Sequence, residues 1–199
     1  MKIRITVVML AALTVAACAG LGTPKGDRSL ERNGEAFVQL QELKSQLQAQ
    51  GKMNPELMSK TQQQLQEQES WLGLGDYYYL EGTQYFLSMA AGGTDQANYE
   101  KAQHSLSLSA QYYQDLDEEW LEAQSIWMLA LTNMRAGKPE ETCGYYHKTL
   151  KLLKKPSGQL SEFNYERDKF QAPQEYVQGV MGEACAIYQA QQAVAKNSQ

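Results

Sequence analysis

The chain has no excess of positive charge, few cysteines and no long apolar segment beyond its first residues. Its 199 residues include 18 Lys and Arg against 23 Asp and Glu, a formal net charge of −5 at pH 7. This acidic balance argues against binding to nucleic acid and against charge-driven binding to anionic lipid. After the first residues, no stretch approaches the roughly 20 apolar residues that a membrane-spanning helix needs. The length suits one domain with its own core.

The sequence also lacks the short motifs of common catalytic sites. It contains no Gly-rich phosphate loop, no Gly-x-Ser-x-Gly elbow and no His-Glu-x-x-His pair. Of the two histidines, His104 is expected on the surface of a helix rather than as a general base. The carboxylate pairs at 118–119 and 140–141 stand at predicted helix starts, where the helix dipole favours negative charge. We therefore expect a protein with no cofactor and no metal, and an enzyme is the minority hypothesis.

The first residues have the layout of a secretory signal. Lys2 and Arg4 precede an uncharged, largely apolar run over residues 5–17, and small residues lead to Cys18. The run is too short to span a membrane. Residues 1–17 are therefore predicted to be removed as a signal peptide.

The residues around that boundary, Val15-Ala16-Ala17-Cys18, resemble the lipobox of bacterial lipoproteins. The resemblance implies that Cys18 is acylated and becomes the mature N-terminus, although Val15 stands where leucine is preferred. Ala19 in place of aspartate implies the outer membrane, with the protein on the periplasmic face. The alternative is a plain secretory signal in which Cys18 is incidental. With three glycines and one proline, residues 18–28 are predicted to form a flexible tether.

Apolar residues recur at helical spacing through residues 29–195, which predicts a single all-α domain of six or seven helices. The central helix is expected at 71–91. Only Asp76 and Glu81 are charged there, so this helix is apolar around most of its circumference and needs partners on several sides. Caps and stops place the other helices near 29–50, 55–70, 95–116, 118–136, 139–155 and 173–195. Whether the helix from Pro55 continues into the central one stays open.

The end of the domain is predicted to be a loop followed by a capping helix. Residues 157–172 are polar with interspersed aromatics and predict a loop with at most a short helix. The last helix is expected to cover the open end of the stack, and 196–199 to fray. Its predicted buried stripe consists of Tyr176, Val180, Ala184, Ile187 and Val194.

Two stretches within residues 71–154 resemble tetratricopeptide repeats, helix-turn-helix units of about 34 residues that stack into solenoids. The first match consists of Trp71, Leu74, Gly75, Tyr78, Tyr99, Ala102 and Leu106. The second consists of Leu129, Ala130, the turn at 137–139, Thr142, Tyr146 and Thr149. The spacing from Gly75 to Ala130 is longer than one repeat, and Thr142 stands where alanine is usual. The resemblance implies tetratricopeptide-like hairpins with lengthened helices.

Cys143 and Cys185 remain once Cys18 is acylated. In an oxidising envelope compartment an even pair favours a disulfide. One alternative is two buried free thiols. A second is a metal site, because Cys143 and His147 are four residues apart on a helix face, but the sequence offers no second local pair of ligands.

Adjacent tyrosines occur at 77–79, 112–113 and 145–146. Adjacent helical positions are about 100° apart, so if one tyrosine of a set faces the core, another faces elsewhere. Both could still pack at the rim of the core. The functional hypothesis is a partner-binding groove lined by Tyr77, Tyr112 and Tyr145, the members outside the main apolar stripes.

A lipid anchor, a tether and a helical groove together resemble the layout of tetratricopeptide lipoproteins that act as pilotins for secretins or as accessories of outer-membrane assembly and secretion. This resemblance implies a non-enzymatic adaptor that binds an envelope protein. The alternative is a binder of a small apolar ligand, similar to the helical-repeat lipoproteins of solute transport. A closed cavity would favour the ligand binder, and an open groove would favour the adaptor.

Overall fold

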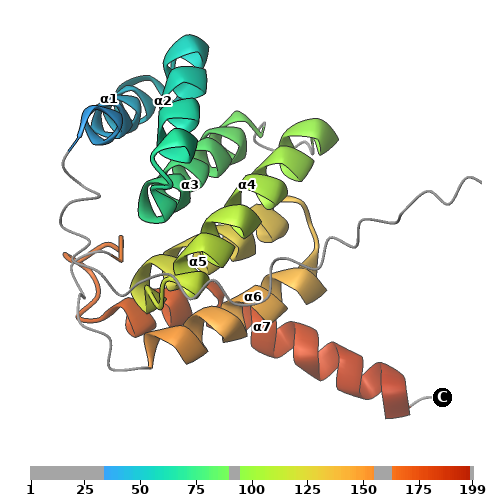
Figure 1. Cartoon of the computed structure of the whole chain (residues 1–199). Helices are drawn as coiled ribbons and strands as arrows, with labels where there is room; N and C mark the ends of the chain where they lie inside the picture. The colour runs from blue at the N-terminus through green and yellow to red at the C-terminus, as the bar shows by residue number, and fades with distance from the viewer. Residues whose placement is uncertain (1–33, 90–94, 155–162, 198–199) are drawn as a thin grey trace, which may run out of the picture.

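The structure, a computed structural model, describes residues 34–89, 95–154 and 163–197. Within these ranges the chain forms a stack of α-helices without strands, which confirms the all-α prediction (Figure 1). The helices are α1 (Glu35–Gln50), α2 (Pro55–Glu67), α3 (Trp71–Ser88), α4 (Gln96–Asp115), α5 (Glu119–Arg135), α6 (Pro139–Leu153) and α7 (Pro173–Asn197). The predicted signal segment, Cys18 and the tether lie outside the described residues. None of the described helices is long and apolar enough to cross a membrane.

Local capping chemistry sets most of the helix ends. The Asn54 side chain accepts hydrogen bonds from the backbone N–H groups of residues 56 and 57 at 2.9 and 3.0 Å, and Pro55 opens α2. Asp95 caps α4 in the same way. Gly51 (φ 67°) ends α1 and Gly137 (φ 68°) forms the turn after α5, both in the left-handed region that glycine adopts without strain.

A short turn separates α2 from α3. It spans residues 68–70 and includes Glu69 in the left-handed region, with φ 50°. The helix from Pro55 therefore does not continue into the central helix. The break precedes Trp71, so Gly73 and Gly75 lie inside α3.

Helix α3 is the centre of the stack, because it contacts α1, α2, α4 and α5. Figure 1 shows α1 and α2 at one end of the molecule and α6 and α7 at the other. Glycines let α4 approach α3 closely: a Cβ atom added at Gly82 would lie 2.6 Å from Cγ of Leu106. The hydroxyl of Ser109 on α4 donates a hydrogen bond to the Gly75 carbonyl at 2.9 Å. The prediction that this helix has partners on several sides is confirmed.

The buried side chains form two main apolar cores. The N-terminal core joins α1, α2 and α3, with Leu43 and Leu65 almost fully buried. The C-terminal core joins α4 to α7 and the loop before α7, and contains Trp127 and Phe163. A smaller cluster around Tyr113 lies beside them. Tyr79 and Phe86 of α3 also pack against the C-terminal core, and Tyr112 of α4 packs against the N-terminal core, so both cores meet along α3 and α4.

Helix α7 packs on α6 through a different face from the predicted one. After its first residue, Pro173, its buried side chains are Val177, Met181 and Cys185, whereas Val180 and Ile187 of the predicted stripe are 40 % and 52 % exposed. The helix contains two interleaved apolar series, and the buried one includes Cys185, which is bonded to Cys143 on α6. The helix also reaches Asn197, so residues 196 and 197 are helical rather than frayed.

Candidate functional site: a groove between the two cores

A groove with a volume of about 510 Å³ lies between the N-terminal and C-terminal cores. Helix α1 forms one wall, the loop after α6 together with α5 forms the other, and α3 and α4 supply the floor. The lining side chains are Phe37, Leu40, Gln41, Lys44, Gln48, Asp76, Tyr79, Leu80, Tyr113, Leu121, Gln124, Phe163, Asn164 and Arg167. We refer to this feature as the inter-core groove.

The α1 wall is one continuous side of a helix. Its lining positions, from Phe37 to Gln48, follow one another at intervals of one, three or four residues. At 1.5 Å per residue this side is about 16 Å long. Leu40 is only 2 % exposed and belongs to the core, whereas Gln41 and Lys44 are exposed. The wall therefore has an apolar base and a polar upper edge.

The floor contains two tyrosines with fixed hydrogen bonds. The Tyr113 hydroxyl, on a side chain that is 2 % exposed, donates to Oδ1 of Asp76 at 2.6 Å. The Tyr79 hydroxyl accepts a hydrogen bond from Nε2 of Gln124 at 3.1 Å. These contacts join α3 to α4 and to α5, and so hold the floor in place.

The loop wall is fastened to the same network. The backbone N–H of Asn164 donates to Oε1 of Gln124 at 2.5 Å, and Phe163 is fully buried in the C-terminal core against Trp120. The Gln124 amide therefore makes two hydrogen bonds: its Nε2 donates to Tyr79 on α3, and its Oε1 accepts from the loop backbone. The loop residues that face the groove are consequently anchored at its base.

The floor is uncharged at its tyrosines. Burial raises the pKa of Tyr113 well above its ordinary value, and the Asp76 carboxylate raises it further because a second negative charge beside it is unfavourable. Burial also raises the pKa of Tyr79. Both phenols stay protonated at neutral pH and are not bases, and the single proton of Tyr113 is already donated to Asp76. Lys44, Arg167 and Asp76 are the charged side chains of the groove lining described here.

A second, more open hollow of about 340 Å³ lies between α3 and α4. His104 lines it and is exposed, as the sequence predicts. The Ser105 hydroxyl donates to Oε2 of Glu81 at 2.7 Å, which occupies that carboxylate. In the described parts of the chain, no three His, Cys, Asp or Glu side chains are grouped so that they could hold a metal ion.

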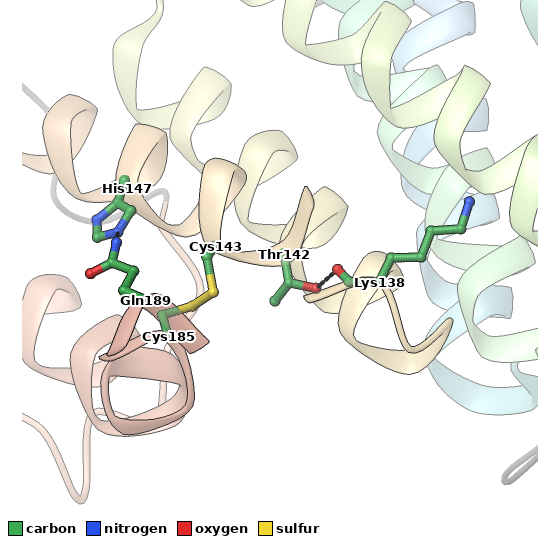
Figure 2. The surroundings of a disulfide bond; sticks show 6 residues. All are labelled: Lys138, Thr142, Cys143, His147, Cys185 and Gln189. Carbon is green, nitrogen blue, oxygen red and sulfur yellow. Dashed lines mark hydrogen bonds between the residues drawn. A yellow bond between two sulfur atoms is a disulfide. The ribbon is translucent and has the colours of Figure 1, made fainter. Parts of the chain in front are cut away.

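The disulfide is formed as predicted. Cys143 and Cys185 are bonded, with their Cα atoms 5.4 Å apart, and they join α6 to α7 (Figure 2). This bond removes both alternatives, the pair of free thiols and the metal site with His147. Nε2 of Gln189 on α7 donates instead to Nε2 of His147 at 2.8 Å. The contacts of α6 with α7 are therefore covalent as well as apolar.

The three tyrosines chosen from the sequence do not line the inter-core groove. Tyr77 is 3 % exposed, because α1 and α2 cover its side of α3. Tyr112 is half-buried and stacks between Trp71 and Tyr78, with ring centroids 6.0 and 5.8 Å apart. Tyr145 is half-buried and packs against the C-terminal core.

Other members of two of these tyrosine sets line the groove instead, namely Tyr79 from the set at 77–79 and Tyr113 from the set at 112–113. No protein-family model, curated protein or solved structure matches this chain. The site is therefore argued from its own residues. Walls that combine apolar and polar side chains, over a floor with two protonated tyrosines and one carboxylate, are suited to holding a segment of another molecule.

Proposed function

We propose that this protein is a lipid-anchored, periplasm-facing adaptor of a bacterial outer membrane that holds a segment of a partner protein in the inter-core groove. The observation that carries the proposal is the α1 wall, an open helix side about 16 Å long. An extended peptide advances about 3.3 Å per residue, so the wall accommodates roughly five residues. The amides of Gln41 and Gln48 along its edge suit hydrogen bonding to such a backbone.

The anchor in this proposal is Cys18, followed by the tether that ends at residue 28. A Gly-rich tether of this length has a root-mean-square reach of about 17–20 Å. The domain would therefore stay close to the membrane and meet partners there. Replacing Cys18 with alanine should release the protein from the membrane fraction, and a variant that still sediments with membranes would contradict the lipid anchor.

The tetratricopeptide-like character of residues 71–154 is part of the same proposal. It is supported by the small residues at the close helix contacts. Ala102 and Leu106 on α4 are fully buried, and Gly75 meets the ring of Tyr113. This alternation of small and large side chains is the packing logic of such repeats.

The adaptor proposal is tested by site-specific photo-cross-linking in cells of the native host. Gln48 and Gln50 are exposed residues of the same type in the last turn of α1, about 200° apart around the helix, and only Gln48 lines the groove. A photoreactive amino acid at position 48 should trap one dominant envelope protein, and the same amino acid at position 50 should trap much less of it. Equal trapping at both positions, or no adduct at 48 in a folded protein, would rule out the groove as the binding site.

A second candidate function is the binding of a small apolar ligand. The groove volume of about 510 Å³ favours it, because pockets for such ligands typically measure about 300–1,000 Å³. Native mass spectrometry of protein purified from its host distinguishes the two. A retained small molecule that is lost on Gln48→Trp would support the ligand binder in place of the adaptor.

A further inference from the structure

The last helix, α7, has an exposed apolar side that is suited to a second copy of the same helix. We infer that two copies of this chain associate through α7, with the two helices antiparallel. The seam consists of Val180, Ala184, Ile187 and Gln191. None of these residues lines the inter-core groove, so the inference stands independently of the adaptor proposal.

The first step of the argument is that this side of α7 is open to solvent. Helix α7 packs on α6 through its other apolar series. Val180 and Ile187 are 40 % and 52 % exposed, and Ala184 and Gln191 are exposed as well. Residues 189–196 are all exposed, and Figure 1 shows this end of α7 projecting beyond the other helices. The described part of the chain therefore leaves the seam uncovered.

The second step is the spacing of the seam residues. They follow one another at steps of four, three and four residues, which is the a/d repeat of a coiled coil. Such a repeat keeps one side of a helix in contact with another helix that lies nearly along it. The seam therefore suits a helical occupant over a length of about 17 Å.

The third step is charge, which favours a second copy as that occupant. The chain has a formal net charge of −5, so two copies repel each other at long range. Residues 184–195 of α7 nevertheless contain no Asp, Glu, Lys or Arg. Two copies can therefore bring these segments together without burying a charge in the seam.

The fourth step is the direction of the pair. Side chains pack best when small ones face large ones. An antiparallel two-fold pair places Ala184 of each copy opposite Ile187 of the other, and Val180 opposite the aliphatic stem of Gln191. A parallel pair would place Ala184 opposite itself and leave a void there. The seam is therefore complementary to itself in the antiparallel direction.

The inference is tested by photo-cross-linking in cells of the native host that make two differently tagged copies of the full chain. Because the seam is short, the pair is expected to be weak, and covalent trapping is the suitable measurement. Gln191 and Gln192 are adjacent exposed residues of the same type, about 100° apart around the helix, and only Gln191 lies in the seam. A photoreactive amino acid at position 191 should give an adduct with both tags, and the same amino acid at position 192 should give much less. Peptide mapping should place the new bond near Val180 of the second copy.

A charge placed in the seam tests whether the adduct depends on it. Ile187→Glu would bury two carboxylates in the pair and should reduce the adduct at position 191 about tenfold or more. The matched Ala186→Glu adds the same charge about 100° away around the helix and should leave the adduct within about twofold. Both variants alter exposed positions of α7, so the fold is expected to persist in each.

The outcomes that would overturn the inference are distinct from those that decide the adaptor proposal. No adduct between copies, equal adducts at positions 191 and 192, or an adduct that survives Ile187→Glu would each overturn it. A bond mapped to residue 191 of the second copy would also overturn it, because only a parallel pair brings these positions together. The adaptor proposal is decided separately, by the probes at positions 48 and 50.

Discussion

The close contact of α3 with α4 makes Gly82 a sensitive position. A methyl group added there would lie 2.6 Å from Cγ and 2.9 Å from Cδ2 of Leu106, and 3.1 Å from the backbone nitrogen of the same residue. Leu106 is fully buried, and its Cγ and backbone nitrogen cannot swing aside. Gly82→Ala must therefore push α4 away from α3.

The size of this effect follows from two opposing contributions. Overpacking a core costs about 1–3 kcal/mol, and the contact with backbone places Gly82→Ala at the upper end. Replacing a helical glycine with alanine in itself stabilises the helix by about 1 kcal/mol. The free energy of unfolding should thus fall by about 2 kcal/mol, which for a domain of this size lowers Tm by about 4–8 °C.

A second glycine supplies the control. Gly144 lies in the exposed side of α6, and a Cβ atom added there has nothing within 4 Å. Gly144→Ala should therefore raise Tm by about 2–4 °C through the helix preference alone. Thermal unfolding followed by far-UV circular dichroism measures both variants. A Gly82→Ala protein as stable as the unaltered chain would refute the close approach of α3 and α4.

Two further predictions concern the disulfide and the buried tyrosines. Replacing Cys143 and Cys185 with alanine should lower the free energy of unfolding by about 4 kcal/mol, the chain-entropy value for a separation of 42 residues, and a loss below about 1 kcal/mol in urea titrations would contradict it. Because the folded-state pKa values of Tyr79 and Tyr113 are raised, their contribution to stability is present below pH of about 10 and is lost as pH rises further. The urea midpoint should fall as pH rises above about 10, and less so in Tyr79→Phe; a flat profile would be inconsistent with this assignment.

The sequence predicts much of the fold because its signals are local. Asn54 and Asp95 each cap the helix that follows them, and Gly137 forms a predicted turn. The central position of α3 follows from its apolar composition on all sides. The disulfide follows from counting cysteines. The caps and the turn are decided by contacts within a few residues, and the disulfide by the two cysteines that remain once Cys18 is set apart.

Features that depend on packing between distant helices could not be predicted in the same way. The α7 sequence offers two apolar series, and only its contact with α6 decides that Val177 and Met181 are buried. Tyr77 is buried for a similar reason, since α1 returns over that side of α3. Lys44 and Arg167 line the same groove, and no periodicity in the sequence between them predicts that they do.

The two walls of the inter-core groove belong to opposite parts of the chain. During synthesis, the last lining residue of α1, Gln48, precedes Phe163 by about 115 residues, which takes roughly 6–23 s at typical translation rates. The loop part of the later wall also lies within the stretch that the bond between Cys143 and Cys185 closes. A chain that ends before this loop therefore has an incomplete groove. Recruitment of a partner would then report that the whole polypeptide has been made and oxidised.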